Sequence, residues 1–290
     1  MTDGIKKKNH TVTRGFLNNW SVVDPKSNNK VIWYFDILKQ EIASSGKKAS
    51  FAISDYIYVP ETRAGMRNEV LENWFAETEG DFCDFSRLAS FGPPNRRLSQ
   101  KYIGNVLKCF IGLSFRSFYQ LRRIREEIAQ LHPEMEAITL ELEVLNNCYG
   151  QITTFFEMAR MLRITVYYGV QQALITQDQS CINLCLRDPP IYKMFMALSP
   201  SCVLVAELDD AIGMTQNFVL NWEQANSNHV FFREFNKNML TTAREWVVFP
   251  NHEAAQTYAS YLSAELVEQR TRIDAARHYL GVDSERIFPI

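Results

Sequence analysis

Residues 66–90, MRNEVLENWFAETEGDFCDFSRLAS, carry the hydrophobic pattern of an amphipathic helix. Mostly apolar side chains recur there every three to four positions, which places them on one face of a helix. The recurring positions are Val70, Trp74, Thr78, Phe82 and Phe85. Glu69, Glu72 and Glu79 fall on or near the other face. The pattern therefore predicts a helix with one apolar stripe and an acidic outer side.

The same periodicity continues after the break at GPPN, residues 92–95. Ser99 is a suitable N-cap for the next helix, and a bend is expected around Gly112. Pro133 fits the first turn of a further helix, which we expect to continue past the middle of the chain towards Tyr168. The two long helices that meet near Pro133 are predicted to pair as an antiparallel hairpin.

Strand patterns lie towards the two ends of the chain. These runs are rich in β-branched and aromatic residues, and turn residues bound several of them. They fall at residues 30–37, 50–59, 173–186, 193–208 and 244–250. A polar helix is expected from Asn221 to about Thr242, and a last helix begins near Asn251.

Helices in the middle and strands at both ends predict an α+β fold that is rich in helix. We expect one small mixed or antiparallel sheet, built from N-terminal and C-terminal strands, with the helical hairpin packed beside it. Residues 10–290 would form this single domain. Residues 1–9 are polar and rich in lysine, so they are expected to be a disordered leader.

Composition narrows the class of protein further. The chain has 290 residues, 46% apolar content and a net charge of -2, so it can bury a large core without disulfides. The near-zero charge argues against a polybasic membrane anchor or a uniform nucleic-acid coat, but it allows a local basic groove. No segment approaches the ~20 uncharged apolar residues that span a bilayer, and the first thirty residues lack the apolar core of a secretory signal. We expect a cytoplasmic protein without a membrane partner; a protein partner or a homo-oligomer is compatible with the composition.

Six cysteines are scattered along the chain without a CxxC motif. Cys181 and Cys185 lie in one predicted strand, about 13 Å apart, which is too far for a disulfide or a shared metal. The cysteines are therefore predicted to be small buried apolar residues.

Three polar residues with useful chemistry cluster near the start of the chain, in HTVTRGFLNNW, residues 10–20. A short helix starting near Thr13 would place Arg14 and Asn18 on one face, with His10 just upstream. A buried arginine needs an acceptor, which would be a carboxylate of the core, a helix end or a bound phosphate.

Carboxylates form the second group of candidates. Glu72 and Glu79 lie two turns apart, about 10.5 Å, which is too far for the two metals of one site to be bound by this helix alone. Glu69 and Glu72 are closer, and any of the three can face a site or solvent. Asp178 sits between two apolar runs at the end of a strand, a position typical of an acid, a base or a metal ligand, and also of an ordinary turn.

A third group is the basic run LRRIREE, residues 121–127, with Arg96 and Arg97 upstream. These residues would contact phosphates or form a solvated helix face. The sequence lacks the nucleotide-binding, zinc-protease and hydrolase motifs GxxxxGK[ST], GxGxxG, HExxH and GxSxG.

The order of these landmarks resembles a bacterial family catalogued as domain of unknown function 4238. The family's opening His-x-Val-Pro-x-x-x-Leu-x-x-Phe resembles HTVTRGFLNNW, and its early strand resembles VIWYFDI. Its tyrosine segment and acidic helix resemble SDYIYV and NEVLENWFAETEGDF, and its late Asp-x-Pro strand resembles ALITQDQS. Its closing segments resemble MALSPSCVLVAEL and REFNKNMLTTAREWVVFP. Thr13 and Ser180 stand where the family has proline.

The resemblance implies that polar residues from the whole chain converge in one pocket that includes His10 and Arg14. The positions carried over are His10, Glu72 or Glu79, Asp178, Ser199 and Asn236. It implies no established activity, and the genomic settings of family members suggest conflict with phages or other invaders.

Two hypotheses follow from these residues. In the first, the protein is a phosphodiesterase-like or nuclease-like hydrolase of nucleic acid or nucleotides that acts in anti-phage defence. His10 would be the general acid or base, and Asp178 with Glu72 would position water or a divalent metal. The substrate would be bound by Arg14, Asn18, Ser199 and Asn236. In the alternative, the protein is a non-enzymatic sensor or partner-binding module of a bacterial defence or toxin system, and the same polar residues hold the fold together.

Overall fold

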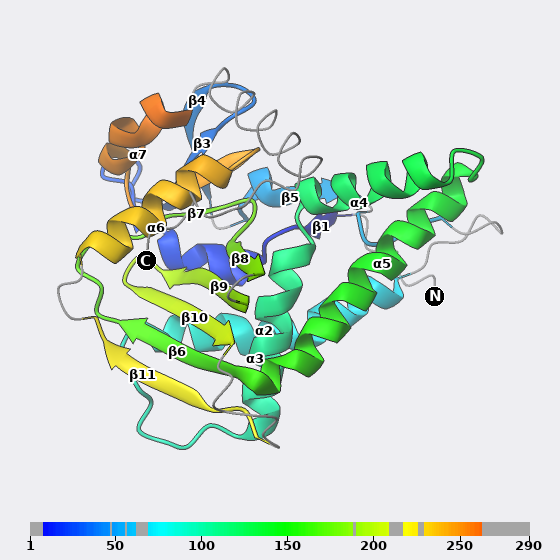
Figure 1. Ribbon diagram of the computed structural model, residues 1–290. Coiled ribbons are helices and arrows are strands. Elements are labelled where there is room, and N and C mark those ends of the chain that lie inside the picture. The colour runs from blue at the N-terminus through cyan, green and yellow to red at the C-terminus, as the bar shows by residue number, and fades with distance from the viewer. Residues whose placement is uncertain are drawn as a thin grey trace, which may run out of the picture.

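The computed structural model describes residues 8–46, 48–55, 57–61, 69–187, 190–208, 217–225 and 229–262 (Figure 1). Its α-helices are α1 (Arg14–Leu17), α2 (Val70–Ala89), α3 (Gln100–Phe115), α4 (Phe118–Leu131), α5 (Ala137–Met158), α6 (His229–Thr242) and α7 (His252–Tyr258). Short 3₁₀ turns span Asn18–Trp20, Ser50–Ala52, Ala159–Met161 and Ala259–Leu262.

Within the described residues, the strands form two five-stranded sheets and one two-stranded ladder. The first sheet has the order β11 (Leu220–Gln224), β6 (Leu162–Tyr168), β10 (Cys202–Leu208), β9 (Pro190–Ser199) and β8 (Cys181–Arg187). The second has the order β2 (Val22–Val23), β3 (Lys30–Asp36), β12 (Trp246–Phe249) and β7 (Thr176–Gln177), with β4 (Glu41–Gly46) paired to β3. The ladder joins β1 (Lys8–His10) to β5 (Ile53–Asp55).

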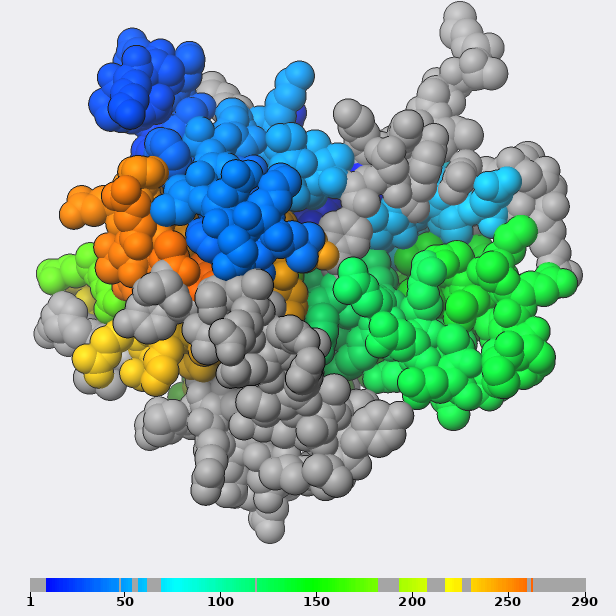
Figure 2. Space-filling view, turned by 90° about the horizontal axis from the view of Figure 1, so that it is seen from above, coloured from blue at the N-terminus to red at the C-terminus, as the bar shows by residue number. Residues whose placement is uncertain are grey.

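The α+β fold class predicted from the sequence is confirmed, but the sheet is divided in two. The second sheet joins distant parts of the chain, as expected, because β3 pairs antiparallel with β12 from Trp33 opposite Phe249 to Asp36 opposite Trp246. Seen from above in Figure 2, the blue N-terminal and orange C-terminal segments lie side by side. The first sheet is built from residues 162–224 alone and is antiparallel except for β11, which runs parallel to β6.

Helices α2 and α3 pack against each other and against β9 and β8 of the first sheet. The predicted hairpin is confirmed: α4 and α5 run side by side away from the sheet in Figure 1, and an Arg125–Glu141 ion pair joins them. Ser99 caps α3, as predicted, by accepting a hydrogen bond from the amide of Tyr102. Among the described residues, none of the helices is long and apolar enough to span a membrane.

The predicted stripe of α2 is wrong at its N-terminal end. Leu71 and Phe75 are buried there, whereas Val70 is 74% exposed and Trp74 is half-buried. Four residues turn a helix by about 400°, so a stripe read in steps of four drifts by about 40° at each step. The later positions Thr78, Phe82 and Phe85 are buried as predicted.

Several predicted helix ends were also wrong. Helix α5 begins at Ala137 rather than at Pro133 and stops at Met158, because the β-branched run that follows it forms β6. The stretch from Leu220 to Gln224 is a strand rather than the start of a helix, since it finds a parallel partner in β6.

The start of the chain is more ordered than predicted within the described residues. Lys8 and Asn9, expected in the leader, belong to β1, and Asn9 is fully buried. The predicted leader residues 1–7 lie outside the described part. Cys109, Cys148, Cys181 and Cys202 are buried free thiols, as predicted, whereas Cys83 is only half-buried. The side chain of Cys185 lies outside the described part.

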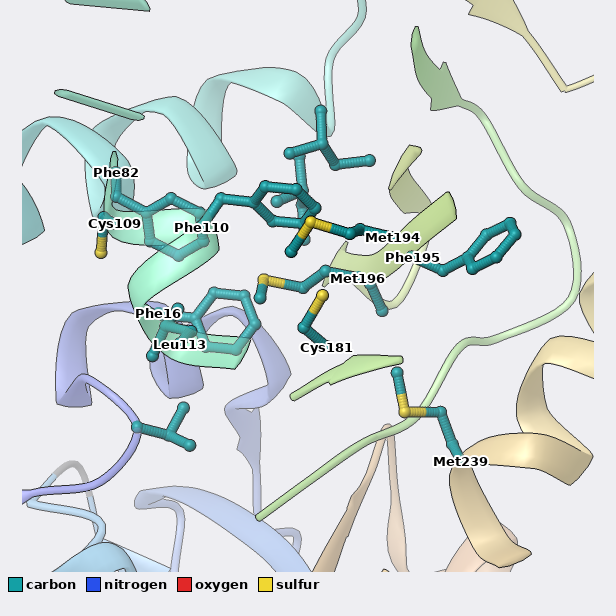
Figure 3. Close-up of a cluster of buried hydrophobic side chains, with 14 of the residues drawn as sticks. Phe16, Phe82, Cys109, Phe110, Leu113, Cys181, Met194, Phe195, Met196 and Met239 are labelled. Carbon is teal, nitrogen blue, oxygen red and sulfur yellow. The ribbon is translucent and has the colours of Figure 1, made fainter. Parts of the chain in front are cut away.

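One continuous apolar cluster lies between the helices and both sheets. Figure 3 shows part of it: Phe16 of α1, Phe82 of α2 and Phe110 of α3 gather near Met194 and Met196 of β9. Burial of such side chains is the main favourable term in folding, at about 25 cal/mol per Å² of apolar surface.

Gly92 and Gly150 allow a matched test of backbone conformation. Gly92 follows α2 with φ of +95°, and an added Cβ would lie 3.0 Å from the Tyr168 ring. Gly92→Ala should therefore lower the free energy of unfolding by about 1–2 kcal/mol or more. Gly150→Ala, in helical backbone with nothing within 4 Å of the new Cβ, should raise it by about 1 kcal/mol. Urea denaturation measures both; equal losses would contradict the strained conformation of Gly92.

Candidate functional site

The charged centre of the N-terminal half is Arg116, which directly follows α3 and is 1% exposed. Its Nη2 lies 2.7 Å from Glu79 Oε1, and its Nε donates to the carbonyl of Thr11 at 3.1 Å. The guanidinium carbon also stands 4.6 Å from the centre of the Phe75 ring. A buried guanidinium requires such acceptors, so Arg116 joins α2, α3 and the N-terminal segment at one point.

His10 lies at the edge of this group. Its Nε2 is 3.3 Å from the carbonyl oxygen of Lys48, and the imidazole is partly buried at the end of β1. Burial lowers the pKa of His10, an effect opposed by the Lys48 carbonyl and by Glu79. Arg14 and Arg116 lower the pKa further. The charges of Glu79, Arg14 and Arg116 thus all act on His10, and Arg116 is a residue that the sequence analysis had not singled out.

Asp178 belongs to a different part of the molecule, at the end of β7. It is 2% exposed, and its Oδ1 accepts hydrogen bonds from the amides of Arg244 at 3.0 Å and Glu245 at 3.2 Å. Oδ2 has no hydrogen-bond partner among the described residues. Among the residues that the structure describes, no hydrogen bond or ion pair connects Asp178 with His10. The carboxylate thus fixes the turn between α6 and β12.

Burial raises the pKa of the Asp178 carboxyl, while the backbone amides of Arg244 and Glu245 act in the opposite direction. The neighbouring Glu245 has its pKa raised to about 7, mainly by burial and then by the charge of Asp178. Two adjacent carboxyl groups with raised pKa values are an acid–base feature found in many active sites. However, the described residues contain no group of three His, Cys, Asp or Glu side chains that could hold a metal ion.

The remaining candidates make hydrogen bonds within the fold. Asn236 of α6 bridges to the carbonyl of Ala173 and the amide of Ile175, and so connects the helix to the segment before β7. Ser199 accepts a hydrogen bond from Ser90 at 2.8 Å, which ties β9 to the end of α2. Arg14 is exposed, whereas Asn18 is half-buried and its Oδ1 has no hydrogen-bond partner among the described residues.

An apolar pocket of about 310 Å³ opens between α2 and α5. Its lining residues are Tyr58, Pro60, Val70, Leu71, Trp74, Leu142, Leu145, Asn146 and Tyr149. Trp74 and Tyr149 meet edge to face with ring centres 5.2 Å apart, and Val70 and Tyr149 are 74% and 43% exposed. Asn146 contributes an amide, which can donate and accept hydrogen bonds.

Tyr58 connects this pocket to the Arg116 group. Its ring lines the pocket, and its hydroxyl donates to the carbonyl of Arg116 at 2.5 Å. Burial raises the pKa of Tyr58 far above its usual range, and the charge of Glu72 contributes in the same direction. Glu72 therefore lies near the pocket, although it does not line it.

Sequence reasoning missed Arg116 and most of the pocket. Arg116 stands in an apolar run and looked like a mere interruption of it, although a lone charge in such a run is a usable signal of a buried ion pair. The pocket residues come from three separate segments, and only the register of α2 against α5 brings them together. No local motif marks them.

Comparisons with protein-family models, with curated proteins and with solved structures each gave no match. The resemblance to domain of unknown function 4238 therefore stays a prediction from the sequence.

The Arg116–Glu79 pair predicts an asymmetric double-mutant cycle. Glu79→Gln leaves the buried guanidinium without its counter-charge, so the free energy of unfolding should fall by about 3–5 kcal/mol. Arg116→Met in addition removes that uncompensated charge and should restore part of the loss. Chemical denaturation of the wild type, both single variants and the double variant checks this; a double variant less stable than Glu79→Gln would contradict it.

Two variants of Asp178 test whether the fold needs its side-chain oxygen as a hydrogen-bond acceptor or also needs its negative charge. Asp178→Ala leaves the amides of Arg244 and Glu245 without an acceptor and should cost about 1–3 kcal/mol. Asp178→Asn keeps an oxygen acceptor without a charge to bury, so its melting temperature at pH 8 should equal or exceed that of wild type. An equal loss in both variants would show that the negative charge itself is needed.

Proposed function

We propose that the protein is a non-enzymatic binding module and that the α2–α5 pocket is its ligand site. The observation that carries this proposal is the pocket itself, whose aromatic lining is partly exposed to solvent. A volume of about 310 Å³ lies at the lower end of the range for small-molecule pockets, which are usually apolar with a few polar groups.

The ligand class follows from the lining. Trp74 and Tyr149 offer ring faces and edges to the pocket, which favour a flat aromatic partner, and the buried ring of Tyr58 backs the same wall. Asn146 supplies one polar contact that would fix its orientation. The acidic residue Glu72 near Tyr58 disfavours an anion, and the ammonium of Lys108, 4.2 Å from the centre of the Trp74 ring, disfavours a cation. We therefore infer a neutral aromatic molecule of about two to three rings.

One residue predicted to be catalytic, Asp178, and two predicted to bind substrate, Asn236 and Ser199, have roles within the fold, which favours a binding module over a hydrolase. Asp178 accepts a hydrogen bond from the backbone amide of Arg244, and Asn236 donates one to the backbone carbonyl of Ala173. Ser199 accepts one from the hydroxyl of Ser90. Hydrolysis of nucleic acid or nucleotides, a divalent metal, a cytoplasmic location and a role in bacterial defence remain predictions from the sequence.

The experiment is a fluorescence titration with N-phenyl-1-naphthylamine, a neutral probe that brightens in apolar surroundings. The wild type should bind it saturably. Val70→Asp places a charge at the exposed mouth of the pocket and should weaken binding, since a bound ligand would take part of the water away from that charge. The anionic relative 8-anilino-1-naphthalenesulfonate has the same rings and should bind more weakly than the neutral probe.

Leu131→Asp is the matched control, because Leu131 is 75% exposed at the end of α4 and does not line the pocket. It should bind the probe as wild type does, and melting curves should show all three proteins folded. Absence of saturable binding in wild type, or equal binding by the Val70 and Leu131 variants, would refute the pocket as the ligand site.

A further inference from the structure

The connection between α2 and α3 carries a large aromatic side chain that is exposed to solvent. Phe91 is 86% exposed, and Leu88, one turn earlier, is 43% exposed. An exposed phenylalanine ring keeps its apolar surface in water, so it does not contribute to the free energy of folding as a buried ring does.

The segment that carries Phe91 is fixed to the first sheet. Gly92 packs against the ring of Tyr168 at the end of β6, and Ser90 donates to Ser199 of β9. At its other end, the Gln100 side chain makes two hydrogen bonds to the backbone of Phe218, at 2.7 and 3.1 Å. In Figure 1 this teal segment runs beside β11. Phe91 therefore lies in a turn whose two ends are held in place by contacts with the rest of the fold.

Positive charge surrounds this turn. Arg96, Arg97 and Lys101 are exposed and form no ion pair with a described residue. A fourth cation, Arg87, pairs with Asp84 at 2.6 Å. The other nearby carboxylate, Asp81, accepts a hydrogen bond from Asn105 at 2.7 Å.

Arg96, Arg97 and Lys101 are exposed within six residues of one another. Burial, Asp81 and Asp84 raise the pKa of the nearby Tyr102 hydroxyl, and the charges of Arg96 and Arg87 lower it. Three exposed cations thus follow one exposed aromatic ring within ten residues, in a chain whose net charge is -2. We name Phe91, Arg96, Arg97 and Lys101 the basic turn.

We propose that the basic turn binds single-stranded nucleic acid, with a base stacked on Phe91 and phosphates held by Arg96 and Arg97. Base stacking on aromatic side chains together with arginine contacts to the backbone is the common chemistry of single-strand binding. A membrane fits less well, because stable anchoring needs two strong signals and one phenylalanine with three unpaired cations supplies neither a chain-sized apolar group nor a polybasic run. The basic turn lies outside the α2–α5 pocket and does not depend on the ligand proposed for it.

Fluorescence anisotropy with a labelled oligothymidine of about 12 nucleotides, within the site sizes of single-strand binders, tests the proposal. Phe91→Ala should weaken binding by about tenfold. The double variant Arg96→Ala, Arg97→Ala should weaken binding and reduce the slope of log affinity against log salt by about 1.4, since each lost phosphate contact removes about 0.7.

Matched controls lie elsewhere on the surface. Leu38→Ala removes an equally exposed apolar side chain, and Arg233→Ala with Lys237→Ala removes two exposed cations of α6. Both control proteins should bind the oligonucleotide as wild type does. Unchanged binding in the basic-turn variants would overturn the proposal. Phosphatidylserine vesicles that bind through Phe91 while the oligonucleotide does not bind would also overturn it, in favour of a membrane contact.

Discussion

A single buried positive charge governs the N-terminal half of the molecule. The guanidinium of Arg116 is almost fully withdrawn from water, so every acceptor around it must be held in place. Glu79 supplies the counter-charge from α2, Thr11 supplies a carbonyl from the N-terminal segment, and Tyr58 bonds to the arginine's own carbonyl. The segment before α1, the segment after β5 and two long helices are thereby fixed relative to one another. Apolar burial supplies most of the stability. The buried charge restricts the arrangement of the helices, because only arrangements that keep its acceptors in place avoid an uncompensated charge.

The pocket and the Arg116 group share one residue, so their properties are linked. Tyr58 presents its ring to the pocket and its hydroxyl to the backbone that follows α3. A ligand in the pocket would lie against a wall backed by Tyr58, a fully buried side chain that cannot turn away without giving up its hydrogen bond. The pocket wall is therefore rigid on this side and more adaptable at Val70 and Tyr149, which are exposed to solvent. Such a combination suits recognition of a flat molecule by shape.

The sequence revealed the elements more reliably than their partners. The spacing of apolar residues, the helix cap and the runs of β-branched and aromatic residues located α2, α3, the hairpin and the strands β3 and β12, because these signals are local. It did not reveal that the strands divide into two sheets, since strand pairing depends on distant segments. Asp178 was recognised as unusual, yet its amide partners at Arg244 and Glu245 lie more than sixty residues away in the chain. The same reason explains why His10 was placed beside the acidic helix only through a family resemblance, and why Arg116 was overlooked.

The pairing of β3 with β12 has a consequence for biosynthesis. β3 emerges from the ribosome early, but its neighbour on one side is made only when residues 246–249 appear. Until then, β3 and β4 form a hairpin whose open edge can pair with another chain. The strands of residues 162–208 can assemble earlier, because their partners are close in sequence. A chain that ends before Trp246 and has left the ribosome would thus hold one finished sheet and one unfinished sheet, and chaperone binding or aggregation should concentrate on the latter.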